Sequence, residues 1–325
     1  MKKIIFFSEG DFSGTLPRDH PNLRMPEVWY SSLNCPHHPI SRVHEIPDNS
    51  FDIGIIIIPK KLHHLTSYPL LENLRRSCKK IGFMQEGASW IFQDYDIDIQ
   101  LWFLDLMQSM DFGLAHSHKD LHYYQNLLNI PVYHHPTLIL DDPINGFDKP
   151  NCEEKVVIGG NLVRYYGGLN SFLVAKYLDC EIWSPSMGRK KENEEQIKDL
   201  NHFPWMLWAD WMKKLSSFKY AIHLNPNTIA GSFNLNCAYW GIPCIGNKHQ
   251  HTQTACFPEL SIEPDDLKTA KELALRLKDD HGFYQECSDK AKENYQKHFS
   301  EEKYLLKMSK VFSTILDENQ LNTAS

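Results

Sequence analysis

The sequence lacks any long apolar run. No stretch approaches the roughly 18 apolar residues that a membrane-spanning helix requires. The apolar run at residues 4–7 is followed at once by Ser8-Glu9-Gly10-Asp11, and it is too short for the apolar region of a signal peptide. Both absences predict a soluble, cytoplasmic protein with no transmembrane segment.

Paired cysteines and an excess of basic residues are also missing. The eight cysteines are scattered and none belongs to a Cys-x-x-Cys pair, which is typical of reduced thiols in a cytosol rather than of a disulfide framework. Lys and Arg number 34 against 41 Asp and Glu, so the formal net charge is -7. Nucleic acid and anionic membranes are therefore not the expected partners, although a local basic patch is compatible with this charge.

The familiar nucleotide and metal motifs are absent as well. The glycine-rich stretches fit neither the dinucleotide fingerprint nor the P-loop spacing. The 17 histidines include no His-Glu-x-x-His pattern and no mixed Cys/His spacing that would bring metal ligands together. We therefore expect no metal site and no permanently bound cofactor.

What the sequence does contain is an alternation of short apolar runs with amphipathic segments, which is typical of parallel sheets covered by helices. We expect strands near residues 3–7, 53–58, 80–84, 111–115 and 131–134 in the first half, and near 155–158, 181–183, 220–223 and 242–245 in the second. The expected helices lie near 67–78, 96–108, 118–128, 168–178 and 232–240, and three more follow Pro264.

The chain length of 325 residues favours two domains over one. Residues 136–154 are rich in proline and have little periodicity, which is typical of a linker. The sequence predicts an α/β protein with two Rossmann-like domains, residues 1–140 and 155–325, with C-terminal helices in the second domain and a cleft between the two.

Two turns in the second half favour phosphate and hydroxyl binding. In residues 158–168 a glycine-rich turn joins a strand to a helix, where backbone N–H groups can meet phosphate, although a plain tight turn would look similar. Residues 223–245 form a strand, an asparagine-rich loop, a helix opening at Gly231-Ser232 and a strand after Gly241-Ile242-Pro243. Asparagine amides can both donate to and accept from sugar hydroxyls.

This second stretch, together with the Gly-rich turn, resembles the donor-binding region of glycosyltransferase B enzymes, above all the large retaining family with two glutamates in this loop and helix. The resemblance implies transfer of a sugar from a nucleoside diphosphate donor to a hydroxyl acceptor. Aligned on Gly241-Ile242-Pro243, the two glutamates fall on Thr228 and Asn236. The donor-binding residues we expect are Gly160, Asn161, Arg164, Asn225, Asn227, Gly231, Ser232, Phe233, Asn236 and Lys248.

In this architecture the acceptor and a general base come from loops that follow the strands of the first domain. Glu86 and Asp11 are our candidates for the catalytic carboxylate, although Glu86 would also suit a helix cap. Arg24 and His116 are candidates for binding the acceptor. Surface arginines and structural histidines are common, so Arg24 could equally be an ordinary surface residue and His116 a purely structural one.

Three alternatives remain at this point. Asp94-Tyr95-Asp96-Ile97-Asp98 matches the Asp-x-Asp pattern with which glycosyltransferases of the other major fold hold a metal and a diphosphate, although its acids also suit the start of a helix. Phage DNA glucosyltransferases share the glycosyltransferase B type, so a hydroxymethylated base is a second kind of acceptor. The missing glutamate pair is also compatible with a non-catalytic protein that only binds a nucleotide sugar.

Overall fold

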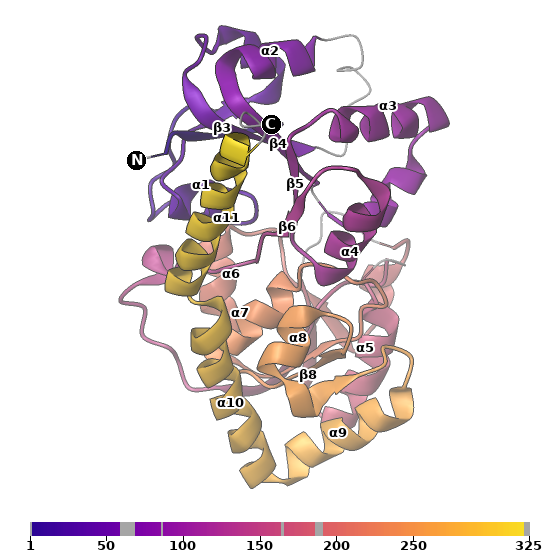
Figure 1. Cartoon of the computed structure of the whole chain (residues 1–325). Helices are drawn as coiled ribbons and strands as arrows, with labels where there is room; N and C mark the ends of the chain where they lie inside the picture. Colours follow the sequence, from indigo (N-terminus) through magenta and orange to yellow (C-terminus); the bar gives the residue numbers. More distant parts are fainter. Residues whose placement is uncertain (1, 59–68, 86, 164–165, 186–190, 322–325) are drawn as a thin grey trace. The chain divides into compact units, whose positions relative to one another are not determined.

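The computed structural model describes residues 2–58, 69–85, 87–163, 166–185 and 191–321 (Figure 1). The chain divides into two compact units: unit 1 comprises residues 1–136 and 301–325, and unit 2 comprises residues 137–300. In the part of the chain that is described, no helix combines the length and the apolar character needed to span a membrane.

Unit 1 is built on a six-stranded sheet in the order β2-β1-β3-β4-β5-β6, and its strand pairings are parallel. The strands and helices are β1 (Ile4–Ser8), α1 (Glu27–Ser32), β2 (His37–Pro39), β3 (Phe51–Ile58), α2 (Leu70–Ser77), β4 (Cys78–Gln85), α3 (Ile97–Gln108), β5 (Phe112–Ala115), α4 (His118–Leu127), β6 (Val132–His134) and α11 (Glu301–Leu321). Short 3-10 helices cover Ile40–Glu45 and Ser89–Asp94. The five strands expected in this half are all present.

Unit 2 has a second six-stranded sheet, in the order β12-β11-β10-β7-β8-β9, again with parallel pairings. Its elements are β7 (Glu153–Ile158), α5 (Gly168–Ala175), β8 (Glu181–Ser184), β9 (Leu200–His202), α6 (Trp208–Leu215), β10 (Phe218–His223), α7 (Ser232–Trp240), β11 (Cys244–Asn247), α8 (His251–Cys256), β12 (Ser261–Ile262), α9 (Leu267–Asp279) and α10 (His281–Phe299). Short 3-10 helices lie at Asp142–Ile144, Lys176–Leu178, Glu194–Gln196 and Pro258–Leu260.

The last helix differs from the expectation that all C-terminal helices belong to the second domain. Helix α11 groups with unit 1. Glu301 accepts two hydrogen bonds from Arg18, at 2.8 and 2.7 Å. The buried Tyr304 hydroxyl lies 2.8 Å from Nε2 of the fully buried His135. Periodicity identifies the apolar face of such a helix but not the surface that it covers, so the sequence places the helix correctly and its unit wrongly.

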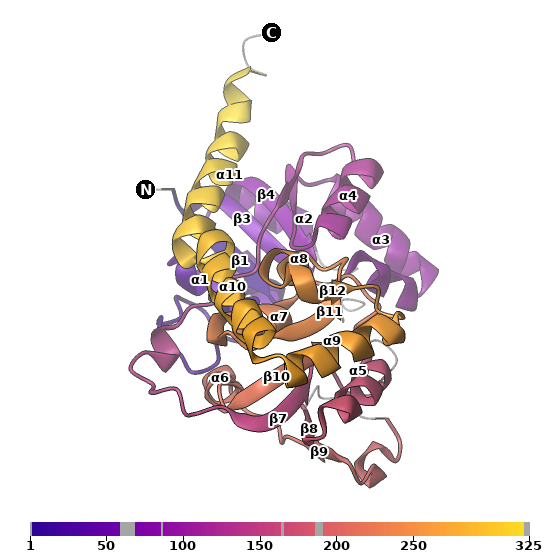
Figure 2. The ribbon, with the colours of Figure 1, turned by 90° about the horizontal axis from the view of Figure 1, so that it is seen from below.

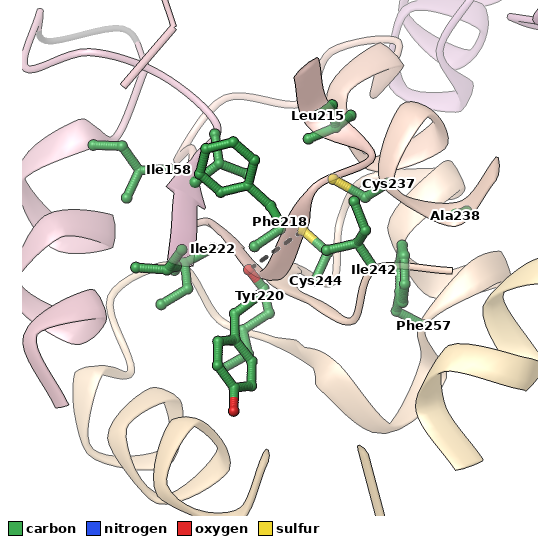
Figure 3. Packing of buried hydrophobic residues seen from close by; sticks show 14 of the residues in the cluster. Ile158, Leu215, Phe218, Tyr220, Ile222, Cys237, Ala238, Ile242, Cys244 and Phe257 are labelled. Atoms are coloured by element: carbon green, nitrogen blue, oxygen red, sulfur yellow. Dashed lines mark hydrogen bonds between the residues drawn. The ribbon is translucent and has the colours of Figure 1, made fainter. Parts of the chain in front are cut away.

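The core of unit 2 contains the apolar side chains of its central strands. Strand β10 contributes Phe218, Tyr220 and Ile222, which are at most 1% exposed. Figure 3 shows them with Ile158 of β7, Leu215 of α6 and Cys237 of α7. A parallel strand covered by helices on both sides needs such residues, and their burial is the main stabilising contribution to this sheet.

The strand order of unit 2 determines where a ligand can bind. The first strand in sequence, β7, lies in the middle of the sheet. The chain then proceeds outward through β8 and β9 before returning to β10 on the other side of β7. Figure 2 labels these strands from below. Open α/β sheets bind ligands beyond the carboxyl ends of the strands at such a reversal. In unit 2 these are the loops that follow β7 and β10.

Candidate functional site

The turn after β7 is packed so closely that four positions require glycine. A Cβ atom on Gly159 would lie 2.3 Å from Cγ of His223, and one on Gly160 would lie 2.5 Å from Cβ of Tyr166. A Cβ on Gly168 would come within 1.9 Å of the Asn161 carbonyl oxygen. Tight turns with this close backbone approach are a recognised use of glycine. The glycines predicted to let backbone approach a ligand therefore also let the turn fold against its own strand and helix.

Gly167 joins this turn to the loop after β10. Its φ of 66° is left-handed, and a Cβ there would lie 2.1 Å from the Leu224 carbonyl oxygen. Ser171 completes the junction, because its hydroxyl donates to the Gly167 carbonyl at 2.9 Å and accepts from the Leu224 amide at 2.9 Å. The two turns thus form one connected surface at the carboxyl edge of β7 and β10.

Helices α5 and α7 begin in the same way. Each is preceded by a left-handed glycine, Gly167 or Gly231, which has no side chain with which to cap the first turn. The first N–H groups of a helix have no partner within the helix, and the helix dipole places partial positive charge there. Two such helix starts follow neighbouring strands, which makes this edge suitable for a diphosphate.

The loop between β10 and α7 is hydrogen-bonded by side chains from the end of β11 and from the residues that follow it. The Asn247 amide donates to the Asn225 carbonyl oxygen at 2.8 Å, and the Gln250 amide donates to that of Asn227 at 3.2 Å. The Thr252 hydroxyl donates to the Gly231 carbonyl at 3.0 Å. These bonds fix the loop backbone before any ligand binds. Their donors come from a later strand and helix, so the sequence gives little signal for them.

A buried network of His223, Asn234 and Gln253 lies beneath the same loop. All three side chains are at most 2% exposed. Gln253 Nε2 donates to the carbonyl oxygens of Cys244 at 2.8 Å and Leu260 at 3.2 Å. Its Oε1 therefore accepts from Asn234 Nδ2, and Asn234 Oδ1 lies 2.9 Å from His223 Nδ1. Burial lowers the pKa of His223 to about 4, so the imidazole is neutral at pH 7.

The predicted donor-binding asparagines differ in burial and in their hydrogen-bond partners. Asn225 is 1% exposed and its Oδ1 accepts from the Asn227 amide at 2.9 Å; Asn227 itself is half-buried. In the amide orientation that satisfies both atoms, Asn236 accepts from Trp211 Nε1 at 3.1 Å and donates to the Ser232 carbonyl at 3.2 Å. Asn161 Oδ1 accepts from the Val163 amide at 3.2 Å. Several of these amides therefore already have bonds that shape the turns.

The remaining predicted donor residues lie on the same edge or beside it. Ser232 and the half-buried Phe233 form the first turn of α7, and the Phe233 ring lies 5.1 Å from that of His223. Lys248 is exposed just after β11, and its Nζ is 2.8 Å from Oε1 of Glu263. Arg164 lies outside the described residues.

In unit 1 the predicted residues are dispersed over several elements. Asp11 is exposed in the loop after β1. Arg24 is half-buried, and burial lowers its pKa while the neighbouring Glu27 raises it. His116 directly follows β5, is 9% exposed, and its ring lies 5.9 Å from that of Trp29. Glu86 lies outside the described residues, although its neighbour Gln85 donates to the Ala88 carbonyl at 2.9 Å.

Sequence reasoning missed a pair formed by Ser8 at the end of β1 and His37 at the start of β2. The Ser8 hydroxyl lies 2.7 Å from Nε2 of His37, and Nδ1 of His37 lies 2.9 Å from the Phe12 carbonyl oxygen. Because a carbonyl only accepts, Nδ1 carries the proton and Ser8 donates to Nε2. Burial lowers the pKa of His37 to about 4. Every ring nitrogen here has a partner, so the pair stabilises the fold without leaving a group for a ligand.

The Asp-x-Asp segment lies at the start of α3. Asp96 is the residue before the helix and Asp98 is in its first turn, both exposed, where negative charge is favourable. Within the described ranges, no three His, Cys, Asp or Glu side chains are grouped so that they could hold a metal ion.

The chain is similar to known proteins in structure but not in sequence. No protein-family model matches the chain, and no curated protein matches its sequence. Among solved structures, TarM of S. aureus has a TM-score of 0.63 at 12% identity over 86% of this chain, which spans 58% of TarM. Sucrose-phosphate synthase from Thermosynechococcus elongatus has a TM-score of 0.65 at 11% identity, with 100% of both chains covered.

A third solved structure is an alpha-glucosyltransferase in complex with UDP and a 13-mer DNA containing an HMU base. Its TM-score is 0.62 at 12% identity, over 97% of this chain and 99% of the other. At such low identity the likeness concerns the fold. Together with the two parallel sheets, it confirms the predicted fold class: the chain is an α/β protein of two Rossmann-like units of the glycosyltransferase B type.

Proposed function

We propose that the protein is a glycosyltransferase that binds a nucleoside diphosphate sugar in unit 2 and moves the sugar to a hydroxyl acceptor. The observation that carries this proposal is the pair of helices α5 and α7, each with a left-handed glycine at its N-cap, which follow the adjacent strands β7 and β10. The fold likeness to solved nucleotide-sugar transferases supports the same function.

The diphosphate is proposed to bind at the backbone N–H groups of residues 232–234 and of the first turn of α5. These groups lie on a backbone that Thr252, Gln250 and Ser171 already hold in place, so binding costs little further ordering. Arg164 is proposed as a further phosphate ligand, as the sequence suggested. At Gly160 and Asn161 the backbone itself is proposed to lie close to the phosphates.

Lys248 is proposed to contact the phosphates by exchanging its present partner. Its ion pair with Glu263 has both side chains nearly half exposed, at 46% and 44%. Exposed pairs of this kind contribute roughly 0–1 kcal/mol, so a doubly charged phosphate group can compete for the lysine. The catalytic carboxylate is proposed to be Glu86 or Asp11, and Arg24 and His116 are proposed to bind the acceptor.

The test is release of nucleoside diphosphate from UDP-, GDP-, ADP- and CDP-glucose, measured with and without saccharide and lipid-linked acceptors. We expect one donor to release its diphosphate, faster with an acceptor. Lys248→Gln should raise the donor KM by about threefold to tenfold, since one charge-assisted contact is lost. The control is Lys290→Gln. Lys290 on α10 forms similar ion pairs with Glu259 and Glu286, and its replacement should leave the donor KM unchanged. Binding of a donor without release under any condition would contradict the transferase.

A second candidate acceptor is a hydroxymethylated base in DNA. The solved structure with DNA bound matches nearly the whole length of both chains, whereas the net charge of -7 argues against a general affinity for DNA. Duplex DNA with hydroxymethylated bases therefore belongs in the same assay. Diphosphate release that depends on this duplex, with binding that weakens steeply as salt rises, would favour the DNA acceptor over a glycan.

A further inference from the structure

The strongest unassigned feature is the imidazole of His223. His223 is the last residue of β10 and is 2% exposed. It lies between the two turns of the candidate site. Its Cγ and Cδ2 atoms face Gly159 of the first turn, and its ring meets that of Phe233 at the start of α7. This position is in the middle of the proposed donor site, and no sequence pattern singles it out.

The buried network fixes which nitrogen of the ring carries the proton. Gln253 Nε2 faces two carbonyl oxygens, so the orientation of its amide is determined. Asn234 must then donate to Gln253 Oε1 and accept through its own Oδ1. Nδ1 of His223 is therefore the donor in that bond, and in the neutral ring Nε2 has a free lone pair.

Nε2 has no hydrogen-bond partner among the described residues. Some side-chain atoms of the described residues have no partner and are also sealed from solvent, but Nε2 of His223 does not belong to that group. This nitrogen is therefore open to solvent. An acceptor that has no protein partner and is open to solvent can accept a hydrogen bond from water or from a ligand. Gly246 makes room for the network, because a Cβ there would lie 2.5 Å from Gln253 Oε1 and 3.0 Å from Asn234 Nδ2. The chain thus holds an acceptor in one orientation at this edge.

We propose that His223 Nε2 accepts a hydrogen bond from a hydroxyl group of the nucleotide sugar, with Asn234 and Gln253 as positioning residues. The proposal rests on the proposed function. A neutral nitrogen with a lone pair attracts a hydroxyl hydrogen and repels a phosphate oxygen. His223 therefore separates the hydroxyl-binding part of the site from the phosphate-binding helix starts. The hydroxyl belongs either to the ribose or to the transferred sugar.

The experiment measures Kd by calorimetry for the intact chain and for His223→Phe. The probes are ADP, GDP, UDP and CDP, the 2′-deoxy and 3′-deoxy forms of the tightest binder, and its glucose conjugate. His298→Phe, at an exposed histidine of α10, is the control. If the hydroxyl is on the ribose, one deoxy probe should bind the wild type about threefold to tenfold more weakly and the variant no more weakly than its parent. If it is on the sugar, only the conjugate should lose affinity in the variant.

Two results would overturn the proposal and are distinguishable from each other. If His223→Phe lost the same affinity for every probe, or lost affinity for none, His223 would not recognise a hydroxyl, while the proposed function would stand. Absence of binding by all probes to the wild type would contradict the proposed function as well.

A second measurement does not depend on how the variant folds. In wild-type protein labelled with ¹⁵N-histidine, Nε2 of His223 should have the chemical shift of an unprotonated ring nitrogen and should move upfield when the glucose conjugate binds, since the conjugate carries both the ribose and the sugar hydroxyls. A protonated Nε2, or an Nε2 resonance unaffected by saturating glucose conjugate, would overturn the assignment.

Discussion

A Gly167→Ala variant is expected to lower the free energy of unfolding of unit 2 by about 3 kcal/mol. Two effects combine in this estimate. The φ of 66° is left-handed, which costs a residue with a Cβ about 1–2 kcal/mol. The new Cβ would also lie 2.1 Å from the backbone oxygen of Leu224, which cannot move aside as a flexible side chain can. The junction between the two turns must therefore open.

Gly146→Ala is the matched control for this variant, because Gly146 also belongs to unit 2. Its φ is 75°, but a Cβ there would meet no atom within 4 Å. The control should therefore lower the free energy of unfolding only by the cost of placing alanine at a left-handed φ, about 1 kcal/mol. Urea denaturation followed by tryptophan fluorescence measures both. Equal losses in the two variants would mean that the approach of Gly167 to Leu224 is not the constraint that we describe.

The second large effect is expected for Gln253→Leu. This substitution leaves the carbonyl oxygens of Cys244 and Leu260 and the Asn234 amide without their present partner in a buried region. Each unsatisfied buried group costs about 1–3 kcal/mol, and relaxation reduces the sum, so we expect a loss of about 3–5 kcal/mol. The gain from burying a leucine does not offset this, since the surrounding groups are polar.

Gln285→Leu provides the comparison for Gln253→Leu. Gln285 is exposed on α10, and among the described residues its side chain bonds to the neighbouring Asp289 alone, so its replacement should change stability by less than about 0.5 kcal/mol. Thermal unfolding of both variants, followed by circular dichroism, gives the difference. A midpoint for Gln253→Leu that coincides with that of the control would contradict the structural role of the network.

The fold could be predicted from the sequence because its main strands are long and apolar. Residues 53–58 have no polar face and are recognisable as a buried strand. Residues 218–223 have one fully apolar face, formed by Phe218, Tyr220 and Ile222. The helix predicted at residues 232–240 has those bounds in the structure. The strands that escaped prediction, β2, β9 and β12, are short, and β2 reads His-His-Pro, which carries no apolar pattern.

The candidate site was only partly predictable. Glycines 160 and 231 mark the turns in the sequence, because few other residues fit a close or left-handed backbone. The roles of Asn225 and Asn236 were harder to foresee, since amides that can bind sugar hydroxyls can equally bind a neighbouring amide or indole. His223 and Gln253 are thirty positions apart, and only the folded sheet brings them together through Asn234.

The central claim is that a nucleoside diphosphate binds unit 2 at the turns that follow β7 and β10. Hydrogen–deuterium exchange of the intact chain, with and without the tightest-binding nucleoside diphosphate, tests it most directly. We predict slower exchange in peptides that cover residues 158–168 and 223–236, because ligand phosphates and hydroxyls would occupy their backbone and side-chain groups. Unchanged exchange in both segments, with protection elsewhere in the chain, would contradict the claim.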